Sequence, residues 1–139
     1  MKEAFRKQWV CLTTNTWTSV QNLNYMCLTA HFIDSNWKTH KRILSFHLVE
    51  NHKGETLGKA VEICVLDWGI YKILTITVNN AVSNSELISF IQKKTKHRKA
   101  KILDNKYLHL RCSAHILNLI VHEGLTEMDE TIVKVRKSV

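Results

Sequence analysis

Hydrophobic and polar positions in the first fifty residues follow the pattern of β-strands joined by short turns. The stretch WVCLTT at 9–14 is rich in β-branched and apolar residues and predicts a strand that ends near Asn15. Two more strands are predicted at 25–33 and 37–49, and the polar segments 19–24 and 34–36 between them are typical of turns. Connections this short predict an antiparallel meander.

The spacing of the apolar positions changes after residue 53. Leu57, Val61, Val65 and Trp68 recur at helical spacing, which predicts a helix over 54–68 that ends at Gly69. The nearly continuous apolar run at 70–78 predicts a strand buried on both faces. The remaining predicted elements are a helix at 83–94, a strand at 107–111 and a third helix. That third helix starts at 113–121, is broken or kinked near Gly124 and resumes through 131–133.

The predicted order is therefore three strands, then helix, strand, helix, strand and helix. It is the order of the α/β class with a ribonuclease H-like fold, in which a mixed five-stranded sheet is flanked by helices. In that topology the first and fourth strands are neighbours, and their carboxyl ends meet where open α/β sheets bind ligands. Those ends are Asn15 and Asn79. A different α+β sandwich with the same order is the alternative.

Composition narrows the class of partner. The chain has 139 residues, 45% of them apolar, which suffices for one domain with a hydrophobic core. Its 20 Lys and Arg against 12 Asp and Glu give a formal charge of +8. That excess favours a polyanionic partner, nucleic acid first, with a generically basic surface as the alternative. No apolar run is long enough to span a bilayer, and the first residues lack the apolar segment of a secretory signal.

The four cysteines are widely spaced, at Cys11, Cys27, Cys64 and Cys112. Without a CxxC pair, a zinc ribbon or a thioredoxin-type site is not expected. We expect free, mostly buried thiols in a reducing compartment.

Four segments carry a resemblance to a known family. They are TTNTWTS at 13–19, YMCLTAHFI at 25–33, TVNNAVSN at 77–84 and RCSAHILNLIV at 111–121. In this order and at these separations they closely resemble the catalytic core of hAT-superfamily transposases, the plant Ac-like and RICESLEEPER-like group above all. The resemblance runs from about Trp9 to about Leu125. It implies a basic lead-in at 1–8, a partial ribonuclease H-like core at 9–125 and a helical extension at 126–139.

The resemblance also implies a site. The family's enzymes hold divalent metal ions with three acidic residues, one after the first strand, one after the fourth and one far downstream. The first position is Asn15 and the second is Asn79 in this chain, and the third would fall beyond Val139. The family's BED zinc finger and its dimerisation segment are not found in this sequence either.

An amide is a poor substitute for these ligands. Mg²⁺ prefers anionic oxygens, whereas a carboxamide has one neutral oxygen and an NH₂ group that faces a cation unfavourably. The acids Asp34, Asp67 and Asp104 are predicted in a turn, near a helix end and before the fifth strand, away from the two strand ends. We therefore expect no catalytic residues, no bound metal or other cofactor, and no enzymatic activity. Read without the resemblance, Asn15 and Asn79 are ordinary turn residues.

Other candidate residues follow from the same motifs. Trp17 lies near bound DNA in the family, with a half-buried aromatic on the sheet as the equal alternative. Cys112 and His115 supply only two of the four ligands that zinc needs, so we expect Cys112 to be buried and His115 to begin the third helix, with Asn118 bonding a neighbouring loop. Trp9, Trp37 and Trp68 are expected to pack in or around the core.

The cations of the run 93–101 are candidates for phosphate contact or nuclear import, with a solvated helix end as the alternative: Lys93, Lys94, Lys96, Arg98, Lys99 and Lys101.

The sequence thus predicts a fragment derived from a hAT transposase, without catalytic activity, that binds DNA weakly and without sequence preference. One alternative is an active metal-dependent transposase or nuclease core. Another is a protein-interaction remnant without DNA affinity that self-associates through exposed apolar surface. We expect no membrane partner, and location in the nucleus, with the cytoplasm as the alternative.

Overall fold

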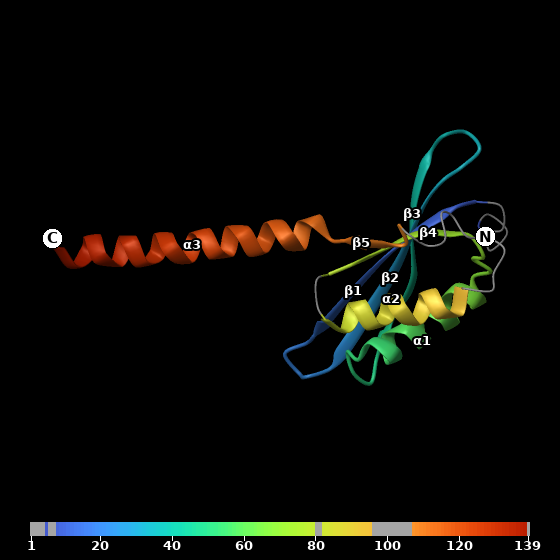
Figure 1. Ribbon diagram of the computed structural model, residues 1–139, viewed down its shortest axis with the longest axis horizontal. Coiled ribbons are helices and arrows are strands. Elements are labelled where there is room, and N and C mark those ends of the chain that lie inside the picture. The colour runs from blue at the N-terminus through green and yellow to red at the C-terminus, as the bar shows by residue number, and fades with distance from the viewer. Residues whose placement is uncertain (1–4, 6–7, 80–81, 96–106, 139) are drawn as a thin grey trace.

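The computed structural model describes residues 5, 8–79, 82–95 and 107–138 (Figure 1). Its elements are β1 (Val10–Thr18), β2 (Asn24–Ile33), β3 (Thr39–Leu48), α1 (Gly54–Asp67), β4 (Ile73–Val78), α2 (Val82–Thr95), β5 (His109–Arg111) and α3 (Ser113–Ser138). They form one five-stranded sheet in the order β3-β2-β1-β4-β5. β1, β2 and β3 pair antiparallel, and β1, β4 and β5 pair parallel. The predicted order of elements and α/β class are confirmed.

The hydrophobic core lies between one face of the sheet and the helices α1 and α2. Val10 and Leu12 of β1 are fully buried, because side chains alternate along a strand and every second one faces the helices. Leu57 and Val61 of α1 and Leu87 of α2 complete the same cluster. Figure 1 shows both helices on this side of the sheet. The opposite face is called the open face below.

Several element boundaries differ from the prediction. β1 continues through Asn15 to Thr18, because its last residues pair with Asn24–Met26 of β2. β4 begins only at Ile73, and only Ile76 and Val78 are buried along it, since helices cover one face of the sheet and not both. The prediction that this strand is buried on both faces is wrong.

α3 is one continuous helix of 26 residues that projects from the body (Figure 1). The predicted break at Gly124 is wrong, because a single glycine inside a helix costs only about 1 kcal/mol relative to alanine and does not by itself end it. The helix also runs through 125, where we predicted the core to end. None of the described helices, α3 included, is both long and apolar enough to cross a membrane.

The tryptophans and cysteines occupy mixed environments. Trp68 is partly buried and its indole N–H donates to the carbonyl of Leu44 at 2.9 Å, as expected for a core residue. Trp37 is 87% exposed, so its predicted place in or around the core is wrong. All four cysteines are free. Only Cys64 is buried, and desolvation raises the pKa of its thiol to about 11.

Gly58 sets how closely α1 and α2 approach. A β-carbon at this position would lie 2.7 Å from Cδ1 and 2.9 Å from Cγ of Phe90 on α2. Cβ of Phe90 would also lie 3.2 Å away, and rotation of the ring about its side-chain bonds leaves that atom in place. The absence of a side chain at Gly58 therefore lets the two helices pack together over the sheet.

We expect Gly58→Ala to lower the free energy of unfolding by about 1–3 kcal/mol, because the added methyl group overpacks the α1–α2 contact. Urea titration followed by far-UV circular dichroism measures this change. Gly124→Ala is the control, since nothing lies within 4 Å of a β-carbon there. It should leave the body unchanged and raise helix content. Equal stability of Gly58→Ala and wild type would contradict the close packing.

Candidate functional site

Of the two asparagines in the candidate motifs, Asn15 lies in β1 and Asn79 directly follows the adjacent strand β4. β1 and β4 are paired in parallel, and the last pair is Thr13 opposite Thr77, so Asn15 and Asn79 each come two residues after it. Asn15 lies on the open face, because it alternates with the buried Leu12 and Thr14 of β1, and Asn79 directly follows the end of β4. Asn15 is exposed and Asn79 is partly buried. The topology brings together the two positions that the sequence analysis singled out.

Asn79 is held by a residue that the sequence analysis did not select. Asn84 of α2 is 3% exposed, and its Nδ2 donates to the backbone carbonyl of Asn79 at 3.0 Å. The same amide also donates to the side-chain oxygen of Asn79. The only available signal was the last asparagine of the segment TVNNAVSN, whose burial at the start of a helix depends on tertiary packing. The oxygen that would face a metal already accepts a hydrogen bond.

The described residues do not fit a divalent metal site. No three His, Cys, Asp or Glu side chains of the described ranges gather closely enough to hold an ion. Asp34 follows Ile33 at the far end of β2, whereas Asn15 pairs with Cys27, so the two lie about 20 Å apart at the usual strand rise of ~3.3 Å per residue. Asp67 ends α1, and Asp104 lies outside the described residues.

Trp17 belongs to an aromatic cluster on the open face. Its ring stacks on Tyr25 with centroids 5.5 Å apart and planes at 15°, and Phe46 lies 5.4 Å away. Trp17 is 36% exposed and Phe46 is 60% exposed. Trp17 is thus a half-buried aromatic two residues beyond Asn15, which leaves part of its ring available to a ligand.

The C-x-x-H motif lies where β5 gives way to α3. The backbone N–H of Cys112 donates to the carbonyl of Val78 at 2.9 Å, which fixes the start of α3 beside β4. Cys112 is only partly buried, contrary to the expectation of full burial. His115 lies in the first turn of α3, as expected, and Asn118 is exposed on the same helix.

The basic run is only partly within the described residues. Lys93 and Lys94 close α2, and both are exposed. The amine of Lys94 is 3.5 Å from the carboxylate of Glu62 and 5.4 Å from the ring centroid of Phe90. The other members of the run, Lys96, Arg98, Lys99 and Lys101, lie outside the described residues. Since α2 leads away from Asn79 under the other face of the sheet, Lys93 and Lys94 do not join Asn15 and Asn79 in one site.

Comparison with known proteins identifies the family. Residues 13–108 match the model of the ZBED1 RNase-like domain, and residues 110–139 match that of the ZBED1 RNase-like helical domain. The chain belongs to the hAT transposase family. The sheet is accordingly ribonuclease H-like, and α3 falls in the segment that matches the helical domain.

Similar hAT-family proteins occur in plants. The chain is 35% identical over 127 residues to the "Putative AC transposase" of Zea mays, which covers 89% of this chain and 16% of that protein. It is 32% identical to "Zinc finger BED domain-containing protein RICESLEEPER 2" of Oryza sativa over 94% of this chain and 18% of that protein. It is 35% identical to the Arabidopsis thaliana protein DAYSLEEPER over 83% of this chain and 17% of that protein. The chain thus spans less than a fifth of each relative.

Substitution of Asn84 measures how strongly the site depends on it. We expect Asn84→Ala to lower the free energy of unfolding by about 1–3 kcal/mol, because it removes the donor to Asn79 and opens a small cavity. Chemical denaturation followed by circular dichroism provides the measurement. Ser85→Ala, at an exposed neighbouring position of α2, should change stability by less than about 0.5 kcal/mol. If the two variants were equally stable, the hydrogen bonds of Asn84 would not support the site.

Proposed function

We propose that this protein is a hAT transposase-derived core that has lost metal-dependent catalysis and retains weak DNA binding without sequence preference. The observation that carries the proposal is the pair of neutral amides: Asn15 in β1, and Asn79 directly after the parallel neighbour β4. A protein that binds DNA in this way would be located in the nucleus.

Electrostatics supports the loss of catalysis. In a two-metal site the ions stabilise the attacking and leaving oxygens of an in-line displacement. Each unit charge lost near such a dication removes roughly 8 kcal/mol of Coulomb attraction at ~4 Å and an effective dielectric constant of about 20. Desolvation offsets much of this, but a net loss of ~3 kcal/mol per ligand still lowers metal affinity more than a hundredfold. Two amides at the site therefore disfavour any bound pair of ions.

Charge supports the retained DNA binding. The formal charge of +8 attracts a polyanion, and exposed cations such as Lys93 are free to meet phosphates. The partly exposed ring of Trp17 lies on the open face, where it offers a stacking surface. Contacts of this kind do not read base edges, so the binding should be sensitive to salt and insensitive to sequence.

One assay tests both halves of the proposal. The protein is titrated onto a labelled duplex over a range of salt concentrations, with and without Mg²⁺ or Mn²⁺. We expect a shift at low salt and no cleavage, with a log–log salt slope near −3.6 if about four cations meet phosphates. No shift at low salt would contradict DNA binding. Cleavage that needs the metal would contradict the loss of catalysis.

A gain-of-charge variant serves as the positive control for the metal argument. In Asn15→Asp/Asn79→Asp, one carboxylate lies in β1 and the other directly follows the adjacent strand β4, so Mn²⁺ should raise the melting temperature of this variant and not that of wild type. Asn22→Asp/Asn118→Asp adds the same charge at exposed, separated positions and should not respond.

A second candidate function is self-association through α3. Leu117, Val121, Leu125 and Met128 recur at helical spacing on one side of α3, and each is 49–62% exposed. Figure 1 shows the helix standing clear of the body. Ile116, Leu119 and Ile120 are exposed as well, so the first half of α3 is apolar on more than one side. The stripe at spacings of four, four and three residues is typical of helices that pair with each other, so the partner we propose is α3 of a second copy.

Charges placed in the stripe test this candidate. We expect wild type to shift towards dimer as its concentration rises, and Leu117→Lys/Leu125→Lys to stay monomeric, because each lysine would be buried unpaired. Light scattering after size-exclusion chromatography measures both masses. His122→Lys/Thr126→Lys adds the same charges away from the stripe and should still associate. A wild type that remains monomeric at every concentration would eliminate this function.

A further inference from the structure

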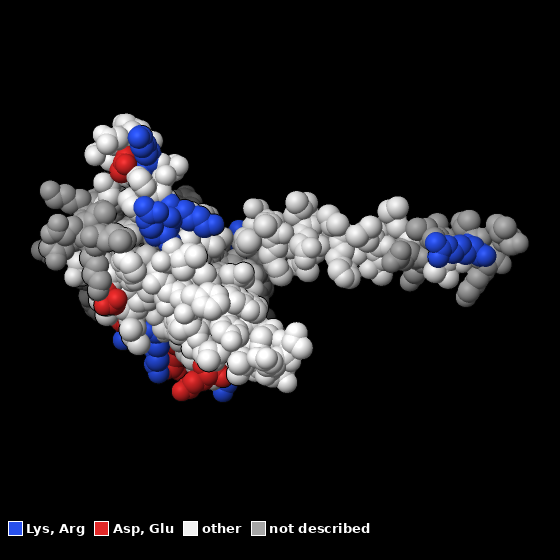
Figure 2. All heavy atoms as spheres, turned by 180° about the vertical axis from the view of Figure 1, so that it is seen from behind, with Lys and Arg blue, Asp and Glu red and all other residues white. Residues whose placement is uncertain are grey.

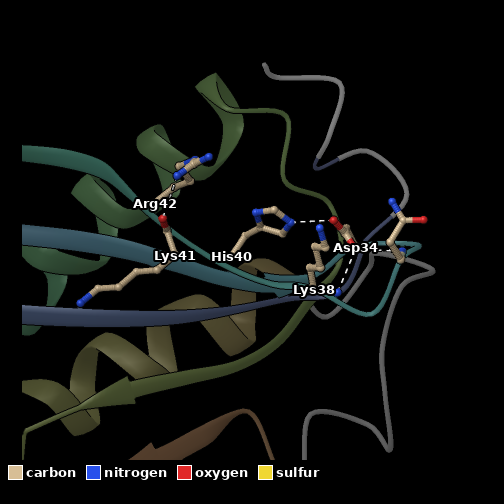
Figure 3. Close-up of polar contacts among 6 residues, drawn as sticks. Asp34, Lys38, His40, Lys41 and Arg42 are labelled. Carbon is tan, nitrogen blue, oxygen red and sulfur yellow. Dashed lines mark hydrogen bonds and ion pairs between the residues drawn. The ribbon is translucent and has the colours of Figure 1, made fainter.

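The connection between β2 and β3 is a tightly held turn. The backbone N–H of Trp37 donates to the carbonyl of Asp34 at 3.1 Å, and that of Asp34 donates to the carbonyl of Lys38 at 2.9 Å. Oδ1 of Asp34 accepts from the backbone N–H groups of Asn36 and Lys38 at 2.8 and 3.0 Å. Oδ2 lies 2.7 Å from Nε2 of His40 (Figure 3). The whole turn is therefore organised around one carboxylate.

That carboxylate is committed to the turn. The hydrogen bond to His40 and those from the backbone lower the pKa of Asp34 below its usual value, so it remains ionised at neutral pH. His40 is held in turn by stacking on Phe32, with ring centroids 5.0 Å apart and planes at 17°. The acceptor atoms of Asp34 face the turn and His40, and the hairpin keeps its shape without a ligand.

The turn holds Trp37 out towards solvent. Trp37 has a φ of 61°, a left-handed conformation that is unfavourable for a large side chain. It is 87% exposed, the most exposed tryptophan in the described parts of the chain. The side chain of Trp37 therefore contributes nothing to the hydrophobic core, and its ring is accessible to a ligand.

Trp37 borders a groove on the same end of the sheet. The groove has a volume of about 790 Å³, and its wall includes Trp9, His31, Ile33, Trp37 and Lys41. Trp9 is 36% exposed, and the amine of Lys72 lies 5.8 Å from the centroid of its ring. The groove has the aromatic rings of Trp9 and Trp37 and the cation of Lys41 in its wall. It therefore suits a ligand with a flat ring and a nearby negatively charged group.

Exposed cations lie on the hairpin beside the groove, whose wall includes Lys41 and Asp34. Lys38, Lys41 and Arg42 are exposed on the hairpin, and Figure 3 shows Lys41 and Arg42 extending in different directions from β3. Basic side chains lie at the tip and at the base of this hairpin in Figure 2. The one carboxylate of the hairpin is Asp34, whose oxygens serve the turn. The groove therefore favours a polyanionic partner over an apolar protein surface or one with few acidic residues.

We infer that this groove binds a nucleobase of single-stranded or locally opened DNA, with Trp37 stacking on the base and Lys38 and Lys41 contacting the adjacent phosphates. Aromatic stacking with nearby cations is the usual way in which proteins hold unpaired strands. The inference rests on the proposed DNA binding and adds to it a place and a preference for unpaired bases. The groove lies at the opposite end of β1 from Asn15.

Fluorescence anisotropy of the full chain with a labelled oligothymidine strand, and with a blunt duplex of equal length, tests the inference. Trp37→Ala should weaken binding of the single strand about ten- to a hundredfold, since stacking contributes ~1–3 kcal/mol per base. Its effect on the duplex should be much smaller. Trp37→Phe should restore most of the affinity, because the ring and not the indole N–H makes the contact.

The cations have their own control. Lys38→Ala/Lys41→Ala should reduce the salt slope for the single strand by about 1.4. Lys59→Ala removes an exposed cation on α1 that is paired with Glu55 at 2.7 Å, and it should leave the slope unchanged. Circular dichroism checks that each variant is folded; both lysines are exposed, so their variant remains informative even if Trp37→Ala does not fold.

The outcomes separate this inference from the proposed function. If wild type binds DNA and neither the Trp37 nor the lysine variants differ from it, the groove is not the site and the proposed function stands. If Trp37→Ala weakens single strand and duplex equally, the groove does not hold an unpaired base and the inference is wrong. If wild type binds no DNA at low salt, the proposed DNA binding and the nucleobase site are both wrong, and the groove would then be assigned to a protein partner.

Discussion

The parallel pairing of β1 with β4 is the constraint on which the site depends. It is fixed from one side by the core, where Val10, Leu12, Ile76 and Val78 pack under α1 and α2. Because strand side chains alternate, burying these residues places Asn15 on the open face, and the parallel pairing brings Asn79 at the end of β4 close to it. The same burial that stabilises the domain thus brings together two residues that are 64 positions apart in the sequence, and no contact between them is needed to place them there.

The sequence predicted the order of elements, the neighbouring strands and the family, because each rests on local periodicity or on motifs read directly from residues. Element ends were harder. β1 runs past Asn15 because Trp17 pairs opposite Tyr25, a contact between strands that neither segment reveals alone. α3 continues through Gly124 because the penalty of one glycine is small beside the hydrogen bonds of the turns around it.

The features that sequence reasoning missed depend on three-dimensional context. The burial of Asn84, and hence its hold on Asn79, requires α2 to lie against the end of β4. The exposure of Trp37 follows from a turn whose geometry is set by Asp34 and His40, six residues apart. Tryptophan side chains are usually well buried, and the backbone conformation of this turn reverses that preference for Trp37. The predicted domain boundaries and the individual DNA contacts remain predictions.

The bond from Asn84 to Asn79 has a wider consequence for how this domain reaches its native state. Closely spaced carboxylates repel each other until cations neutralise them, so an intact site of that kind folds against its own electrostatic strain. Here the two corresponding positions are neutral amides, and Asn79 is bonded by Asn84. With the proposed loss of the metal site, we expect folding to be independent of dissolved magnesium.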